Sequence, residues 1–192
     1  MSKVIKKQMQ RRSMIIEKLI PKLSDTPFDQ LSVADICEAA EISIGSFYHY
    51  FKTKSDLLIG LMGLIDNYMA DVIFPILNNE NELENIKTFA VGWAQYVCEH
   101  GLERSKLISG IKPFDVDYMG KKRLTILKLE EIITAGQKKG QITDLYEPST
   151  LSEFIMFSIR GVSTDWSRHD GSYSVTDKMN DYISFLMRAL KA

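Results

Sequence analysis

The sequence predicts an all-α fold of about nine helices. Apolar residues recur three and four positions apart along most of the chain, which is the spacing of a buried helix face. No segment alternates apolar and polar residues over a useful length, so no strand is predicted. Proline, glycine and short polar segments interrupt the helical pattern at intervals. Of the 192 residues, 45% are apolar, an ordinary fraction for a globular protein.

Charge is distributed unevenly, and we predict two domains, over residues 1–53 and 54–192. Residues 1–54 carry nine Lys and Arg against six Asp and Glu, whereas residues 55–192 carry fifteen against nineteen. A basic head on an acidic body favours contact with nucleic acid at one end only.

The first predicted helix continues through Ile15 and Leu19 to Asp25. Its start is basic and contains no acidic residue, and two interpretations stay open. The segment is either a solvated helix start or an arm that reaches DNA phosphates. The basic residues are Lys3, Lys6, Lys7, Arg11 and Arg12.

The stretch from Ser32 to Lys54 predicts two short helices joined by a tight turn, a helix-turn-helix. Ser32 occupies an N-cap position, and Asp35 can complete a capping box. Glu41 follows the first helix, where a positive φ is expected at a cost of about 1 kcal/mol for a residue other than glycine. Ser43 then caps a second helix, from Ile44 to Phe51.

This second helix has two different faces. Phe47 and Phe51 lie four positions apart and are predicted to join the core. The opposite arc combines polar and aromatic groups that are costly to expose without a purpose, so we predict that it enters a DNA major groove. Its residues are Ile44, Gly45, Ser46, Tyr48 and His49.

Residues 14–58 resemble the N-terminal domain of the TetR family of bacterial transcriptional repressors. The rest of the chain agrees with that family in length and helical character only. Pro21 and Glu41 depart from the family's pattern. The matching residues are Ser32, Ile36, Ala40, Ile42, Ser43, Gly45, Ser46, Phe47, Tyr48, Tyr50, Phe51 and Lys54.

The resemblance implies which side chains touch DNA. Glycine would let the helix approach the bases closely, and Ile44 could meet a thymine methyl group. The residues expected against base edges are Ile44, Gly45, Ser46 and Tyr48. The residues expected at phosphates are Ser32, Ser43, His49, Tyr50 and Lys54.

The remainder begins with a long helix from Lys54 to Pro75, apolar on two faces and therefore expected between neighbours. Further helices are predicted over residues 82–101, 103–112, 116–139 and 148–169, and a last one after Ser174.

Aromatic residues and methionines are numerous in these helices. Residue by residue, core packing is the simpler interpretation. The resemblance implies instead a small, mostly apolar effector bound among them, with Tyr68, Tyr96 and Tyr118 as its polar contacts. The predicted effector-binding residues are Met62, Tyr68, Met69, Phe89, Trp93, Tyr96, Tyr118 and Phe157.

The last two predicted helices are also apolar on two faces, one of which could pair with a second copy of the chain. The resemblance implies dimerisation through a four-helix bundle, which matches an operator with two half-sites. The residues predicted at this interface are Ile155, Ile159, Val162, Trp166, Met179, Ile183 and Leu186.

Patterns of catalysis and metal binding are missing from the sequence. The three His are far apart, and Cys37 and Cys98 have no metal-like spacing. We therefore predict no enzyme, no cofactor and no metal site. A signal peptide is not found, nor is an apolar run of the roughly 18 residues that a membrane span needs. We expect a cytoplasmic protein with no membrane partner.

Taken together, these patterns predict a homodimeric, ligand-responsive transcription factor. We expect a repressor that binds an inverted-repeat operator and is released by a small apolar effector. The alternative is a helical adaptor of the same fold that does not bind DNA.

Overall fold

The computed structural model describes residues 3–26, 28–102, 104–106 and 123–192. Helices make up most of these residues, and strand-like pairing among them is limited to an isolated antiparallel bridge between Ile142 and Lys191. The all-α prediction is therefore confirmed.

The chain divides into two compact units. Of the described residues, those up to Leu64 belong to the first unit and those from Ile65 to the second. The division falls within helix α4 (Asp56–Tyr68), beyond the boundary predicted at residue 53. One helix therefore contributes residues to both units.

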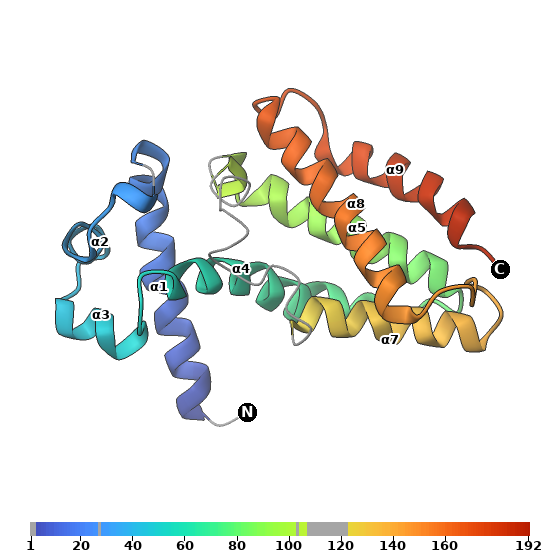
Figure 1. Ribbon diagram of the computed structural model, residues 1–192, viewed down its shortest axis with the longest axis horizontal. Coiled ribbons are helices and arrows are strands. Elements are labelled where there is room, and N and C mark those ends of the chain that lie inside the picture. Colours follow the sequence, from blue (N-terminus) through green and yellow to red (C-terminus); the bar gives the residue numbers. More distant parts are fainter. Residues whose placement is uncertain (1–2, 27, 103, 107–122) are drawn as a thin grey trace. The chain divides into compact units, whose positions relative to one another are not determined.

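The first unit holds four elements and the beginning of α4 (blue to cyan in Figure 1). They are α1 (Lys3–Asp25), the 3-10 turn η1 (Phe28–Gln30), α2 (Val33–Ala40) and α3 (Ile44–Tyr50). Helix α1 starts at Lys3 and continues through Pro21, so the basic segment before Met14 is helical.

The core of the first unit forms where α1, α2, α3 and α4 bury their apolar residues. Gly60 of α4 lies so close to Ile16 of α1 that a Cβ atom would collide with the Cδ1 of Ile16. The fully or nearly fully buried side chains are Ile15, Ile16, Leu19, Leu31, Ile36, Cys37, Phe47, Phe51 and Leu57.

The second unit is built around α5 (Glu82–Glu99), which packs against α7 (Leu124–Lys138), α8 (Pro148–Arg168) and α9 (Val175–Leu190). Helix α7 also packs on α8, and α8 on α9 (Figure 1). The helix expected over 103–112, and the first residues of the one expected over 116–139, lie largely outside the described residues. No helix of the described part is both long and apolar enough to cross a membrane.

The end of the fourth helix differs from the prediction of one α-helix up to Pro75. After Tyr68 the chain forms a π-helical turn, η2 (Met69–Ile73), and then a 3-10 turn, η3 (Phe74–Ile76). The backbone N–H of Phe74 donates to the carbonyl of Met69, five residues back. Pro75 explains the change, because proline has no N–H to donate and its ring crowds the carbonyl four residues earlier.

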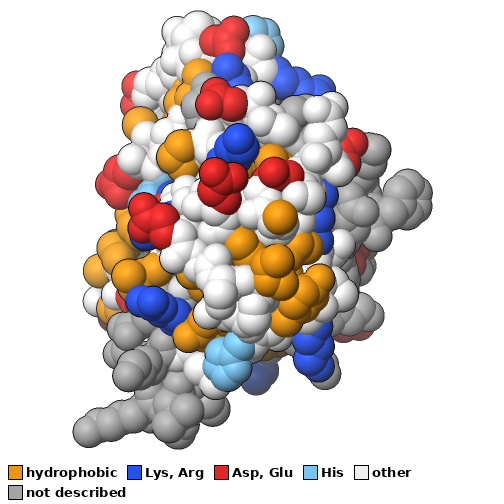
Figure 2. Space-filling view, turned by 90° about the vertical axis from the view of Figure 1, so that its left-hand side faces the viewer, with side chains coloured by type: hydrophobic (Ala, Val, Ile, Leu, Met, Phe, Trp, Pro, Cys, Tyr) orange, Lys and Arg blue, Asp and Glu red, His pale blue; other side chains and the backbone are white. Residues whose placement is uncertain are grey.

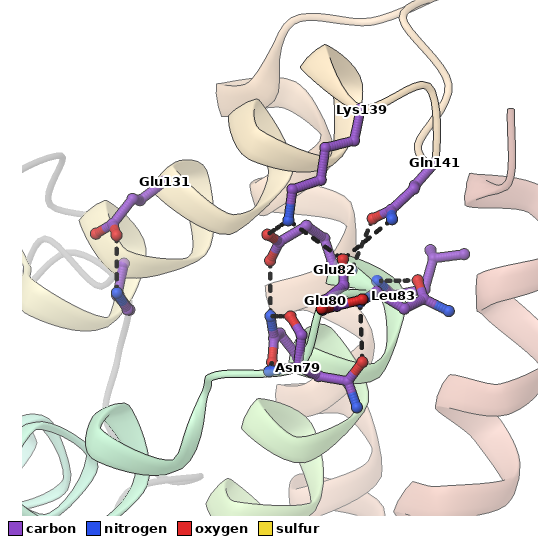
Figure 3. Close-up of polar contacts among 10 residues, drawn as sticks. Asn79, Glu80, Glu82, Leu83, Glu131, Lys139 and Gln141 are labelled. Carbon is purple, nitrogen blue, oxygen red and sulfur yellow. Dashed lines mark hydrogen bonds and ion pairs between the residues drawn. The ribbon is translucent and has the colours of Figure 1, made fainter.

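A polar network closes the start of α5 against the end of α7 (Figure 3). Lys139 Nζ lies 2.7 Å from Glu82 Oε1, and Asn85 Nδ2 donates to Glu82 Oε2 at 2.7 Å. The backbone N–H of Glu82 donates to Gln141 Oε1 at 2.8 Å. Burial acts to raise the pKa of Glu82, but the hydrogen bonds from Lys139 and Asn85 hold it below its ordinary value.

Candidate functional site

The helix-turn-helix begins with a capping box at α2. The backbone N–H of Ser32 donates to Asp35 Oδ2 at 2.7 Å, and the N–H of Asp35 donates to Ser32 Oγ at 3.1 Å. Ser32 Oγ also donates to Asp35 Oδ2 at 2.6 Å, and these bonds lower the pKa of Asp35. Both donors of Ser32 thus serve the cap, and the predicted phosphate contact would have to displace one of them.

The turn between α2 and α3 adopts the backbone conformation that the sequence predicts. Glu41 has φ 55° and ψ 45°, the left-handed region. Its carboxylate pairs with Lys18 of α1, which lowers the pKa of Glu41. The backbone N–H of Ile42 donates to the carbonyl of Cys37 at 2.9 Å. The turn is thereby fixed to the core, and its left-handed residue is tied to α1.

Helix α3 separates its core face from its exposed face as predicted. Phe47 and Phe51 are completely buried, whereas Ile44 is 53% and Tyr48 56% exposed. Gly45 and His49 are exposed as well. Figure 2 shows the side of the molecule on which Figure 1 draws α2 and α3, where hydrophobic side chains gather near a histidine and basic side chains lie close by.

No contact within the described part of the chain requires glycine at position 45. A Cβ atom there would meet only Ser43 Oγ, at 3.9 Å, which is ordinary contact. Glycine inside a helix costs about 1 kcal/mol relative to alanine. The missing side chain therefore favours a close approach by something outside the described chain.

Lys54 is held differently from the prediction of a phosphate contact. Its Nζ donates to the carbonyl of Asp29 at 3.2 Å and lies 4.6 Å from the centre of the Phe28 ring. These contacts make Lys54 an anchor for η1. Lys52, two residues earlier, is exposed next to α3.

Residues 22–61, from the end of α1 into α4, match the sequence profile of a family described as "Bacterial regulatory proteins, tetR family". Over these residues the chain is similar to the TetR family, and its fold is similar to that of solved TetR-family regulators. The predicted resemblance is confirmed, and family and relatives are transcriptional regulators rather than enzymes.

The chain is also similar over nearly its whole length to a curated regulator. It is 24% identical to the "Fatty acid metabolism regulator protein" of Bacillus subtilis (strain 168), over 97% of this chain and 98% of that one. It shares its fold with the fatty acid degradation regulator FadR from Bacillus halodurans, with a TM-score of 0.75 and 20% identity. The match covers 92% of this chain and 94% of that one. The chain also shares its fold with FadR from Bacillus subtilis, whose crystal structure is in complex with stearoyl-CoA. The TM-score is 0.73 and the identity 20%, over 91% of this chain and 96% of that one.

The second unit brings together some of the predicted effector-binding residues. Met69, Phe89, Trp93 and Tyr96 are buried, and Tyr68 is half-buried. Tyr118 and the side chain of Met62 lie outside the described residues. Phe157 is not buried with them, since it is 57% exposed on α8.

Tyr68 and Tyr96 belong to a cluster that the sequence reasoning did not include. The Tyr96 ring lies 5.1 Å from that of Tyr68 and stacks on His100 at 4.0 Å. The buried Arg104 donates from Nη1 to the Tyr96 hydroxyl at 3.0 Å. The spacing of four residues from Tyr96 to His100 and on to Arg104 is the signal that could have indicated this cluster.

The residues predicted at the dimer interface lie mostly inside the subunit, which corrects that choice. Six of the seven are buried by packing within the second unit, where α9 lies on α5 and α8. They are Ile155, Ile159, Val162, Trp166, Met179 and Ile183, whereas Leu186 is half-buried. The apolar side chains that α8 and α9 expose are instead Phe154, Phe157, Tyr182 and Phe185.

Proposed function

We propose that the protein is a homodimeric repressor that binds an inverted-repeat DNA operator through α3 and releases it when an acyl-CoA thioester binds the second unit. The observation that carries DNA binding is the exposed face of α3, where Gly45 leaves space that the described chain does not use. Ile44 and Tyr48 stand exposed on either side of it in the sequence. A helix with this surface suits the major groove, where base edges and thymine methyl groups are accessible.

Selection from random duplexes tests the DNA-binding part. The wild type is expected to enrich an inverted repeat, because a two-fold dimer presents two copies of α3. Its affinity should fall by roughly one power of salt concentration per phosphate contact. Failure to enrich any site would favour the helical adaptor over the repressor.

Dimerisation is proposed through the exposed aromatic face of α8 and α9, defined as Phe154, Phe157, Tyr182 and Phe185. The two helices pack against each other, so one subunit carries all four rings on adjacent helices. Large exposed apolar side chains in such a group are characteristic of protein interfaces. Gly161 of α8 is exposed too, and a Cβ there would meet no described atom within 4 Å. A partner helix could therefore approach closely.

The effector class is proposed from the relatives and from the interior of the second unit. The Bacillus subtilis regulator was crystallised with stearoyl-CoA and shares this fold. In the present chain, buried Met69, Phe89 and Trp93 offer an apolar environment suited to an acyl chain. Arg104 and Tyr96 add a buried cation and hydroxyl that suit the polar thioester end.

Stearoyl-CoA, stearate and free CoA should be compared as ligands of the purified protein. A ligand that binds only the folded state raises the melting temperature by an amount that grows with RT ln(1 + [L]/Kd). We expect stearoyl-CoA to raise it most and to weaken operator binding about 5- to 150-fold. A response to stearate alone would move the proposal to free fatty acids, and no response to any of the three would refute the effector class.

A further inference from the structure

The seven residues of α3 include no Lys, Arg, Asp, Glu, Asn or Gln. Those six side chains make the strongest direct contacts to bases in the major groove. Arg and Lys pair with guanine, Asn and Gln pair with adenine, and Asp and Glu accept from the amino group of cytosine. Recognition by α3 is therefore left to its hydroxyl, imidazole and apolar groups.

Ile44 is the one aliphatic side chain of α3, and it is exposed at the first position of the helix. The next residue, Gly45, leaves the backbone bare, since a Cβ there would touch only Ser43 Oγ. An aliphatic group beside a bare backbone can come within van der Waals distance of a base edge. The apolar group that the major groove presents there is the C5-methyl group of thymine.

The polar groups of the same face have a weaker preference among bases. The hydroxyls of Ser46 and Tyr48 can each donate or accept a hydrogen bond, so they suit several base edges. The Tyr48 ring stands edge-on to the buried Phe47 ring, with centroids 5.2 Å apart and an angle of 88° between the planes. This contact orients Tyr48 without selecting a base. The sharpest selection available to α3 is therefore the methyl contact at Ile44.

We propose that Ile44 reads the C5-methyl group of a pyrimidine in each operator half-site, so that 5-methylcytosine can replace thymine in this contact. This inference rests on the proposed binding of an inverted repeat, and it adds which base atom selects the site and which side chain reads it. Thymine and 5-methylcytosine carry the methyl group at the same ring position and differ at C4. An aliphatic side chain makes no hydrogen bond to the C4 substituent, so it responds to the methyl group alone.

Duplexes that differ by one methyl group test the inference. The inverted repeat enriched by the wild type is synthesised with thymine, uracil, 5-methylcytosine or cytosine at each thymine position, in both half-sites together. Two affinity ratios are measured, thymine over uracil and 5-methylcytosine over cytosine. Within each ratio the opposite base is the same, so the ratio reports the methyl group. At one position we expect both ratios to be about three to five per half-site, the value of one buried methyl group.

Three variants of the full chain show whether Ile44 is the residue responsible. Ile44→Ala should bring both ratios close to one, whereas Ile44→Val keeps part of the contact and should give intermediate ratios. Met14→Ala is the control, because Met14 is an apolar residue of α1 in the same unit with similar exposure, 54% against 53% for Ile44. It should leave both ratios at their wild-type values. Melting temperatures confirm that each variant is folded.

The outcomes separate the inference from the proposed function. A wild type that enriches no duplex would refute the proposed DNA binding and the inference with it. A wild type that enriches an inverted repeat, but whose ratios are close to one at every thymine, would refute the inference alone. Ratios that keep their wild-type values in Ile44→Ala would also overturn it, since the methyl group would then act through another residue or through the shape of the duplex.

Discussion

The hydroxyl oxygen of Ser43 lies 3.0 Å from that of Ser46, and it also accepts the backbone N–H of Ser46 at 3.1 Å. The first turn of α3 is thus closed by two neighbouring serines that were both predicted to contact DNA. The cap orients the Ser46 hydroxyl before any partner is bound, which reduces the entropy that binding has to remove.

Replacing the two serines one at a time should distinguish an effect on the stability of the protein from an effect on recognition of the operator. Ser43→Ala removes the N-cap and should lower the free energy of unfolding by about 1 kcal/mol. Ser46→Ala leaves the cap oxygen in place and should change stability little, while the preference for the selected operator over random duplex falls. Urea unfolding and competition binding measure the two effects. Equal loss of stability in both variants would contradict this division of roles.

Gly45→Ala should make the protein more stable and a poorer DNA binder. Alanine in a helix interior is favoured over glycine by about 1 kcal/mol, and the described chain leaves room for its methyl group. In a major groove the same methyl would hold α3 away from the bases, so we expect at least a tenfold loss of operator affinity. The control is Gly63→Ala, which should gain stability without losing affinity. Undiminished binding by Gly45→Ala would place the DNA contact elsewhere.

Substitutions on the exposed aromatic face of α8 and α9 should change the oligomeric state. Phe157→Glu and Phe185→Glu are expected to give folded monomers, because a charge in an apolar interface is costly to bury. Leu127→Glu provides the control, since Leu127 is an exposed apolar residue of α7, 47% accessible. By contrast, Ile183→Glu should unfold the chain, as its side chain is fully buried. Sedimentation velocity with circular dichroism distinguishes these results, and dimeric Phe157→Glu and Phe185→Glu would exclude this face.

Acid should weaken the network at the start of α5. The pKa of Glu82 is lower in the folded state than its usual value near 4.5, so its contribution to stability is present above that value and is lost as the pH falls through the folded pKa. Glu82→Gln should therefore destabilise the protein at pH 7, and the effect should become smaller as the pH falls below 4.5. Melting temperatures across this range measure the difference. A difference that is constant with pH would show that Glu82 carries no such linkage.

The sequence predicts the structure of the first unit well because local spacing decides it. Phe47 and Phe51 lie four residues apart, so the core face of α3 follows directly. Glu41 occupies the position after a short helix, where chain reversal requires a left-handed residue whatever the side chain. The capping box of Ser32 and Asp35 is likewise a relation over three residues. None of these features depends on distant parts of the chain.

The second unit is less predictable because contacts between residues far apart in the sequence decide which helix faces are buried. Helices α8 and α9 each have two apolar faces, and only packing on α5 shows that Ile159 and Ile183 point inward. The π turn before Pro75 is likewise not revealed by the periodicity of apolar residues. Arg104 is an exception, since its spacing of four residues from His100 could have indicated that it lies beside Tyr96.

The pairing of α5 with α9 also has a consequence for the order in which the molecule is assembled during synthesis. The first unit is held by contacts among elements that follow one another closely in the chain, whereas α5 packs on α9, which is made well after it. Elements with local partners form early, and those with remote partners wait for the partner to be made. On a ribosome the first unit would thus be folded while α5 still lacks α9, its main neighbour. Pulsed hydrogen exchange on stalled nascent chains that end before α9 should find the amides of α2 protected and those of α5 open.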